Sequence, residues 1–236
     1  MRRSAFAPAA IGRRPVLGAA LAWPAAASGS ASSVDLALAL AVDVSGSVDF
    51  AEFGLMIGGY AAAFRDEALV ARLVSGPAGA TAVAMLFWSG PGARDLAVPW
   101  RRIDGGEAAT ALAEAIEGAP RIVPAGATAL GEGLAAALAL LERCPWPASR
   151  RVVDVSGDGR NNAGLPLQTA RAAALAMDVT VNGLAVVNEE PDLEAYYRET
   201  LIAGPGAFVL RADDYGAFPE AILRKLWRET GAAFIA

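Results

Sequence analysis

Residues 34–47 read VDLALALAVDVSGS, and the character of the chain changes within this stretch. An apolar run leads up to Asp43, and the following residues, which include Ser and Gly, cannot continue a buried strand. Asp43, Ser45 and Ser47 lie two residues apart, so their side chains share a direction while the extended geometry persists. Carboxylate and hydroxyl oxygens are the ligands that small hard cations prefer. The stretch therefore predicts a core strand that ends in a cluster of oxygen-bearing side chains.

The composition indicates one globular domain and excludes several classes of function. The chain has 236 residues, 55% of them hydrophobic, which is enough for a large core after removal of a leader. The net charge is -5 and no long Lys/Arg block follows the leader, so we expect no nucleic-acid partner. The chain has no histidine, which excludes Ser-His-Asp and Cys-His catalysis and the usual catalytic zinc sites. Cys144 is the single cysteine and cannot form an internal disulfide.

Residues 1–31 have the pattern of an export signal that is cleaved from the mature protein. Four arginines precede an apolar run over residues 16–23, and small residues follow it. The run is too short to span a bilayer. The segment RRPVL at residues 13–17 loosely resembles a twin-arginine signal, and a general secretory signal is the alternative. An Ala-rich tail that stays attached is the other interpretation; with export, the mature protein is periplasmic or secreted and has no stable membrane span.

Residues 32–236 are predicted to form a single domain in which strands alternate with helices. Its fold class is α/β, a doubly wound, Rossmann-like fold with a mainly parallel six-stranded central sheet and helices on both faces. The strands are expected at residues 34–44, 80–88, 93–103, 150–155, 179–187 and 207–211. The helices are expected at residues 50–64, in a short turn up to 73, and at 107–116, 129–143, 166–177, 192–202 and 215–230. Pro99 places the third strand at or near an edge of the sheet.

Two later strand-to-helix junctions also carry oxygen-bearing side chains. Thr128 precedes a predicted helix, and Asp158 lies in the segment SGDG after the fourth strand. Each motif alone has an ordinary interpretation, as a helix N-cap or as a turn. Right-handed crossovers, however, bring such loops to one edge of the sheet, where α/β proteins bind ligands. An all-oxygen set of this kind suits Mg²⁺, with Mn²⁺ or Ca²⁺ as alternatives, rather than zinc or copper.

The three motifs together resemble the von Willebrand factor A (VWA) domain and its metal-ion-dependent adhesion site (MIDAS), D-x-S-x-S…T…D. They are DVSGS at the end of the first strand, TALGEGL opening a helix, and SGDG at the end of the fourth strand. The resemblance makes Ser45, Ser47 and Thr128 hydroxyl ligands, while Asp43 and Asp158 hold the cation directly or through water. The segments at 156–162 and 204–208 look like a bacterial exported subgroup of these domains. The likeness extends over residues 34–230 and supplies a fold and a site but no partner.

The resemblance implies a non-enzymatic, metal-dependent protein-binding module for adhesion or scaffolding. In the family, an acidic residue of another protein occupies the open position on the cation, so we expect a protein partner that supplies a carboxylate. No catalytic residues are assigned under this hypothesis.

Two other functions compete with it. A Mg²⁺-dependent phosphatase or phosphotransferase could use Asp43 as nucleophile, but such enzymes place a second carboxylate two residues later, where this chain has Ser45. The only lysine, Lys225, stands in the last helix rather than near the loops. A scaffold that binds partners through its helical faces is the third alternative.

Overall fold

One six-stranded sheet forms the centre of the computed structural model, which describes Met1 and residues 32–231. The strand order is β3-β2-β1-β4-β5-β6, and all neighbours are parallel except β2 and β3, which are antiparallel. The strands are β1 Val34–Asp43, β2 Thr81–Trp88, β3 Arg94–Ile103, β4 Ala148–Gly157, β5 Thr180–Val186 and β6 Val209–Ala212. The predicted α/β fold class is confirmed, and the strand with Pro99 is an edge strand, as predicted.

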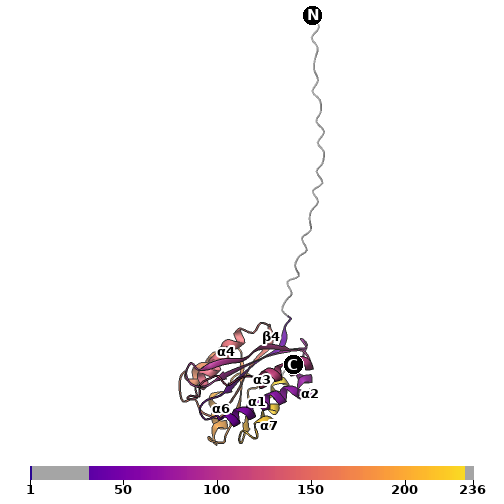
Figure 1. Ribbon diagram of the computed structural model, residues 1–236. Helices are drawn as coiled ribbons and strands as arrows, with labels where there is room; N and C mark the ends of the chain where they lie inside the picture. Colours follow the sequence, from indigo (N-terminus) through magenta and orange to yellow (C-terminus); the bar gives the residue numbers. More distant parts are fainter. Residues whose placement is uncertain (2–31, 232–236) are drawn as a thin grey trace. The chain divides into compact units, whose positions relative to one another are not determined.

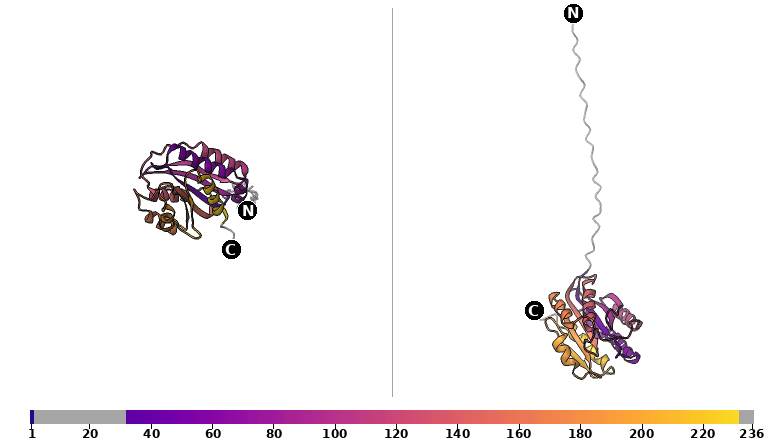
Figure 2. Two further views of the ribbon diagram at one scale, coloured as in Figure 1. Left: turned by 90° about the horizontal axis from the view of Figure 1, so that it is seen from below. Right: turned by 90° about the vertical axis from the view of Figure 1, so that its left-hand side faces the viewer.

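Helices cover both faces of the sheet (Figures 1 and 2). They are α1 Phe50–Arg65, α2 Glu67–Leu73, α3 Gly106–Glu117, α4 Leu130–Glu142, α5 Leu167–Ala176, α6 Leu193–Thr200 and α7 Phe218–Gly231. Side chains of α1, α2, α3 and α7 pack into one apolar cluster, and those of α4, α5 and α6 pack into another. Each helix lies where the sequence predicts one, with ends shifted by a few residues, as is usual for helix boundaries.

Strand β1 contributes to both clusters because its successive side chains point to opposite faces of the sheet, and the side chains on the two faces differ in size. Leucines and a valine at the even positions 36–42 enter the α1/α7 cluster, while alanines at 37, 39 and 41 face the α4 side. Small side chains there let α4 approach closely. At Gly133 of α4, a Cβ atom would lie 2.5 Å from the ring of Trp88, so glycine is required for this contact. Trp88 is 1% exposed and belongs to the core.

Charged and polar side chains are buried between α7 and the sheet. Lys225 Nζ lies 2.6 Å from Asp154 Oδ1 and 3.0 Å from Glu229 Oε1, and all three residues are buried. Asn182 Nδ2 donates to the same oxygen of Glu229 at 3.0 Å. Because one ammonium group faces two carboxyl groups, the charges of the buried network cancel when one of the two carboxyl groups keeps its proton.

We expect this network to make the stability depend on pH. Burial, and then the charge of Asp154, raise the pKa of Glu229 to about 8, although Lys225 and Asn182 oppose the shift. A carboxyl group with a raised pKa binds its proton more tightly in the folded state, so its stabilising contribution is complete below its unfolded pKa and is lost as pH rises through 8. In urea unfolding with EDTA, the free energy of unfolding should fall between pH 5 and 8.

The variant Glu229→Gln should remove part of that slope, since an amide keeps the Oε1 acceptor but does not titrate. The control is Glu220→Gln, because Glu220 is an exposed carboxylate on the same helix. An unchanged slope in Glu229→Gln would contradict the assignment.

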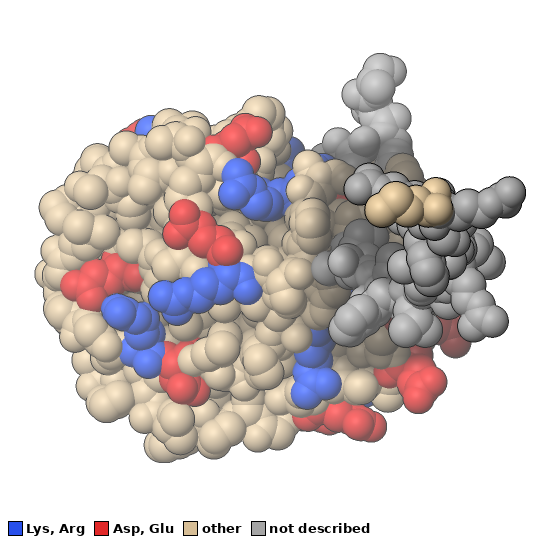
Figure 3. Space-filling view, turned by 90° about the horizontal axis from the view of Figure 1, so that it is seen from above, with Lys and Arg blue, Asp and Glu red and all other residues tan. Residues whose placement is uncertain are grey.

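Residues 2–31, where the predicted export signal falls, and residues 232–236 lie outside the described part of the chain. Within the described part, no helix combines the length and apolar character that a membrane crossing requires. On the face shown in Figure 3, Lys and Arg side chains are interspersed with Asp and Glu side chains.

Candidate metal centre

Three loops with polar side chains meet at the carboxyl end of β1 and β4. These two parallel strands are adjacent, and from them the chain runs outward to β2 on one side and to β5 on the other. Their junction is therefore the switch point of the sheet, where open α/β folds bind ligands. Asp43 is the last residue of β1, and Asp158 directly follows β4. The fold thus brings the two predicted carboxylates to one place.

The five predicted residues form one cluster of oxygen atoms. Ser47 Oγ donates to Asp158 Oδ1 at 2.9 Å, and the two hydroxyl oxygens of Ser45 and Ser47 are 3.3 Å apart. Thr128 Oγ1 lies 3.5 Å from Ser45 Oγ. Asp43 Oδ1 accepts the Ser45 backbone N–H at 2.7 Å, which fixes the start of the loop. The fold therefore brings the side chains of these three loops to one place.

The carboxylates of this cluster are buried and only partly satisfied. Asp43 is 0% exposed and Asp158 is 2% exposed, and each has one oxygen, Oδ2, without a hydrogen-bond partner. Burial first, and then the charge of Asp158, raise the pKa of Asp43 to about 8, although the bonds from Ser45 and the charge of Arg121 oppose the shift. Burial of two neighbouring carboxylates costs free energy unless a cation compensates their negative charge.

The donor set fits a hard divalent cation. Neighbouring ligands of an octahedral Mg²⁺ are about 3 Å apart, because each lies about 2.1 Å from the ion at right angles. The oxygen separations in the cluster, 2.9 to 3.5 Å, are close to this value. In the described residues, no group of three or more His, Cys, Asp or Glu side chains offers a metal site of another type. Hydroxyls together with two carboxylates would therefore carry the coordination.

Helix capping does not account for these residues. Asp49, not a residue of the cluster, caps α1 in a reciprocal capping box with Glu52. Helix α4 begins at Leu130 with Ala129 as its N-cap, so the alternative in which Thr128 is an ordinary N-cap is wrong. The Thr128 hydroxyl faces the cluster because its own backbone is held by another loop: Asn162 Oδ1 accepts the Thr128 N–H at 2.9 Å.

Sequence reasoning missed side chains that surround the cluster. Tyr215, which precedes α7, is 3% exposed, and its hydroxyl lies near Asp158 without forming a hydrogen bond of good geometry within the described residues. Burial raises the pKa of the Tyr215 hydroxyl, and the charge of Asp158 adds to the shift. Tyr197 donates to the Gly159 carbonyl at 3.3 Å, and Arg121 Nη2 donates to the carbonyl oxygens of Val44 and Ser45 at 3.1 Å each. A polar residue far along the chain gives no sequence signal of such contacts.

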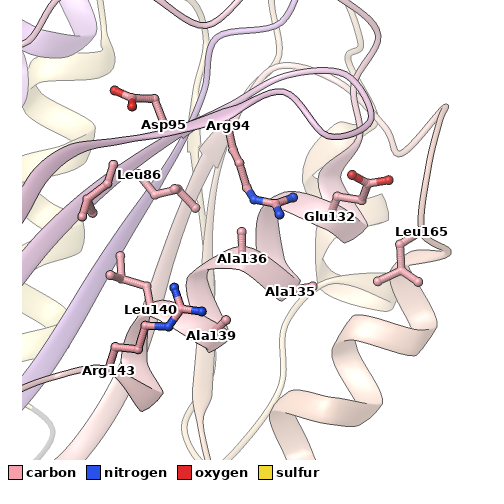
Figure 4. Close-up of a pocket in the computed structure, with 11 residues that line it drawn as sticks. Leu86, Arg94, Asp95, Glu132, Ala135, Ala136, Ala139, Leu140, Arg143 and Leu165 are labelled. Atoms are coloured by element: carbon pink, nitrogen blue, oxygen red, sulfur yellow. The ribbon is translucent and has the colours of Figure 1, made fainter.

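The surface has a separate hollow that contains none of the clustered side chains. It has a volume of about 600 Å³ and lies between β3 and α4, with an alanine-rich floor (Figure 4). Arg94 and Arg143 lie at opposite ends of this hollow (Figure 4). None of the five clustered residues lines it.

The sheet order, the helical layers and the three loops define a VWA-type domain. The chain belongs to the family described as "Protein of unknown function (DUF1194)", whose model matches residues 33–234. Among curated proteins, no significant match was found.

Solved structures with the same fold come from diverse proteins. The chain is 20% identical to a von Willebrand factor type A protein from Catenulispora acidiphila, with a TM-score of 0.55 over 84% of this chain and 43% of that one. It is 17% identical to proximal thread matrix protein 1 of the mussel byssus, with a TM-score of 0.57 over 84% and 47%. It is 12% identical to the PilB minor pilin of Streptococcus sanguinis, with a TM-score of 0.60 over 94% and 65%. The chain thus spans 43–65% of the length of these proteins, and at such identities the likeness shows the fold alone.

Proposed function

We propose that this chain is a non-enzymatic module that binds a partner protein through a divalent cation. The observation that carries the proposal is the pair of buried carboxylates, Asp43 and Asp158, each with an unsatisfied oxygen beside three hydroxyl groups. A cation held by these five residues would neutralise the carboxylates and keep part of its coordination shell for an outside ligand. A carboxylate of the partner is the natural occupant, because it adds the charge that a hard divalent ion prefers.

Mg²⁺ is the cation we propose, with Mn²⁺ and Ca²⁺ as alternatives. All the donors are oxygen atoms, which favours hard ions over zinc. One similar structure, of proximal thread matrix protein 1, has a zinc-occupied MIDAS motif; it is 18% identical to this chain, with a TM-score of 0.55. That example supports a divalent cation at this place in the fold without fixing the metal here.

We further propose that the module acts outside the cytoplasm, as one VWA-like domain over residues 32–236 after cleavage of the leader. The export pattern in residues 1–31 supports this location. Two proteins of the same fold are named as a pilus adhesin, from Lactobacillus rhamnosus, and as a minor pilin, PilB, and these names support a location outside the cytoplasm.

A peptide-binding assay tests the function. We expect immobilised peptides with a single Asp or Glu to bind the purified chain in Mg²⁺, and their Asn or Gln counterparts to bind at least about tenfold more weakly, because the amide brings no charge to the cation. EDTA should abolish the difference. Equal binding of acidic and amide peptides would contradict the proposal, and binding that persists in EDTA would favour the helical faces instead.

The phosphotransferase alternative gains little support from the site. Asp43 is fully buried, and Lys225 lies in the core beside Asp154 rather than at the loops. We expect no turnover of a panel of phosphoesters in Mg²⁺. Turnover that disappears in Asp43→Asn would establish the enzyme instead.

A further inference from the structure

An exposed apolar surface lies directly beside the candidate metal centre. Phe50, the first residue of α1, is 81% exposed, and Ile122, in the loop between α3 and α4, is 62% exposed. The rest of the same loop, up to Thr128, adds further exposed apolar residues. We call this surface the apolar collar; it consists of Phe50, Ile122, Pro124, Ala125, Gly126 and Ala127.

The collar is fixed to the loop that carries Ser45 and Ser47. The Gly46 N–H donates to the Gly126 carbonyl at 2.8 Å, which joins the two loops. Arg121 adds a second connection through its bonds to the carbonyl oxygens of Val44 and Ser45. The guanidinium group of Arg121 also lies 5.4 Å from the centre of the Phe50 ring. The collar therefore keeps its position relative to the metal centre without any partner.

The opposite side of the candidate metal centre carries ion-paired side chains instead of an apolar surface. Beyond Asp158, Arg160 pairs with Glu190 at 2.8 Å and with Asp192 at 2.5 Å, and it stacks over the Tyr196 ring at 4.7 Å. This side offers charged groups that already have partners. The collar side offers apolar area and the positive charge of Arg121.

A hollow of mixed character lies next to the collar. It has a volume of about 440 Å³, and it is lined by residues 122–124, by residues 91–93 of the turn between β2 and β3, and by the charged Arg94 and Asp95 of β3.

We propose that the partner segment carries an aromatic or aliphatic residue next to its metal-binding acidic residue, and that this apolar side chain packs on the collar. The inference rests on the proposed function, because the carboxylate on the cation places the segment. A partner of this kind is complementary in charge to the cation and Arg121, and it covers the exposed rings and methyl groups that the collar presents.

The test uses synthetic peptides with one Glu in a neutral Gly/Ser background, flanked by Phe, Leu or Ser. In Mg²⁺, the wild-type chain should bind the Phe- and Leu-flanked peptides about tenfold more tightly than the Ser-flanked peptide, since burial of one such side chain has an effect of this order. The double variant Phe50→Ser/Ile122→Ser should lose this preference while keeping its affinity for Mg²⁺ and for the Ser-flanked peptide. Leu175→Ser is the matched control, because Leu175 is 50% exposed on α5, outside the collar, and this variant should keep the preference.

Four outcomes would overturn the inference, and they separate it from the proposed function. Mg²⁺-dependent binding of all Glu peptides without an apolar preference, or a preference that survives in the double variant, would refute the collar alone. A wild-type dimer in sedimentation analysis that the double variant dissociates would show that a second copy of the chain covers the collar. Failure of every Glu peptide to bind the Mg²⁺-loaded chain would refute the proposed function and the collar's role together.

Discussion

Replacing Asp43 with Asn is expected to lower the affinity for Mg²⁺ by more than about 100-fold, beyond the roughly 10- to 100-fold effect of losing a group that only orients a ligand. The amide oxygen of Asn can still accept the Ser45 N–H, so the loop keeps its hydrogen bond. One of the two negative charges of the site is removed, however. Isothermal titration with Mg²⁺ and Mn²⁺ measures the loss, and Asp158→Asn should behave in the same way.

The metal-free form of Asp43→Asn should show the opposite effect on stability. In wild-type protein without metal, burial and the charge of Asp158 act against the Asp43 carboxylate and raise its pKa to about 8. A neutral amide relieves this repulsion, so the variant in EDTA should be at least as stable as the wild type in EDTA. Lost metal binding together with retained or increased stability distinguishes a damaged site from a damaged fold.

A matched control lies in the same loop. Asp49→Asn removes the same charge from an exposed position, and Asn serves equally well as the N-cap of α1. It should bind Mg²⁺ as the wild type does. If Asp43→Asn also bound Mg²⁺ as tightly as the wild type, the assignment of the metal centre would be wrong.

The second large effect is expected in the core. Lys225→Met should destabilise the fold by about 3–5 kcal/mol, because it leaves the Asp154 carboxylate buried without its cationic partner. Glu229 gives no compensation, since burial already favours its protonated form. The loss is a large part of the roughly 5–15 kcal/mol that holds a domain folded. Urea unfolding measures it through the transition midpoint.

Two further variants test the cause of that loss. Lys225→Met/Asp154→Asn removes the unpaired charge and should recover most of the stability. Arg224→Met changes the neighbouring residue, whose exposed side chain lies 4.0 Å from Glu220, and should alter the free energy of unfolding by less than about 0.5 kcal/mol. If the double variant were no more stable than Lys225→Met, lost packing rather than lost charge pairing would explain the effect.

Much of the architecture could be predicted because it depends on local patterns. The apolar run at 36–42, followed by Asp, Ser and Gly, is sufficient to predict a buried strand and its end. Alternation of such runs with helical periodicity then implies a parallel sheet, and right-handed crossovers bring Asp43, Thr128 and Asp158 to one edge. The prediction of five clustered residues depends on this topology and on the VWA resemblance, and the folded chain brings the same five residues together.

The surroundings of the site could not be predicted, because they depend on contacts between distant residues. Arg121 reaches the Ser45 carbonyl across 76 residues of sequence, and no local pattern distinguishes it from an ordinary surface arginine. Tyr215 comes beside Asp158 only because β6 and α7 return to the sheet there. Lys225 resembles a solvated helix residue in the sequence, yet packing of α7 buries it against Asp154.

The strand that ends in DVSGS, the α/β fold and the oxygen-bearing residues of the candidate metal centre can be read from the amino-acid sequence, because they follow from residue type, spacing and chain direction. The folded chain is needed to see which oxygens lack partners, which charges are buried and that the apolar collar lies beside the candidate metal centre. Those properties depend on which surfaces are removed from water, and that is settled when the whole chain packs.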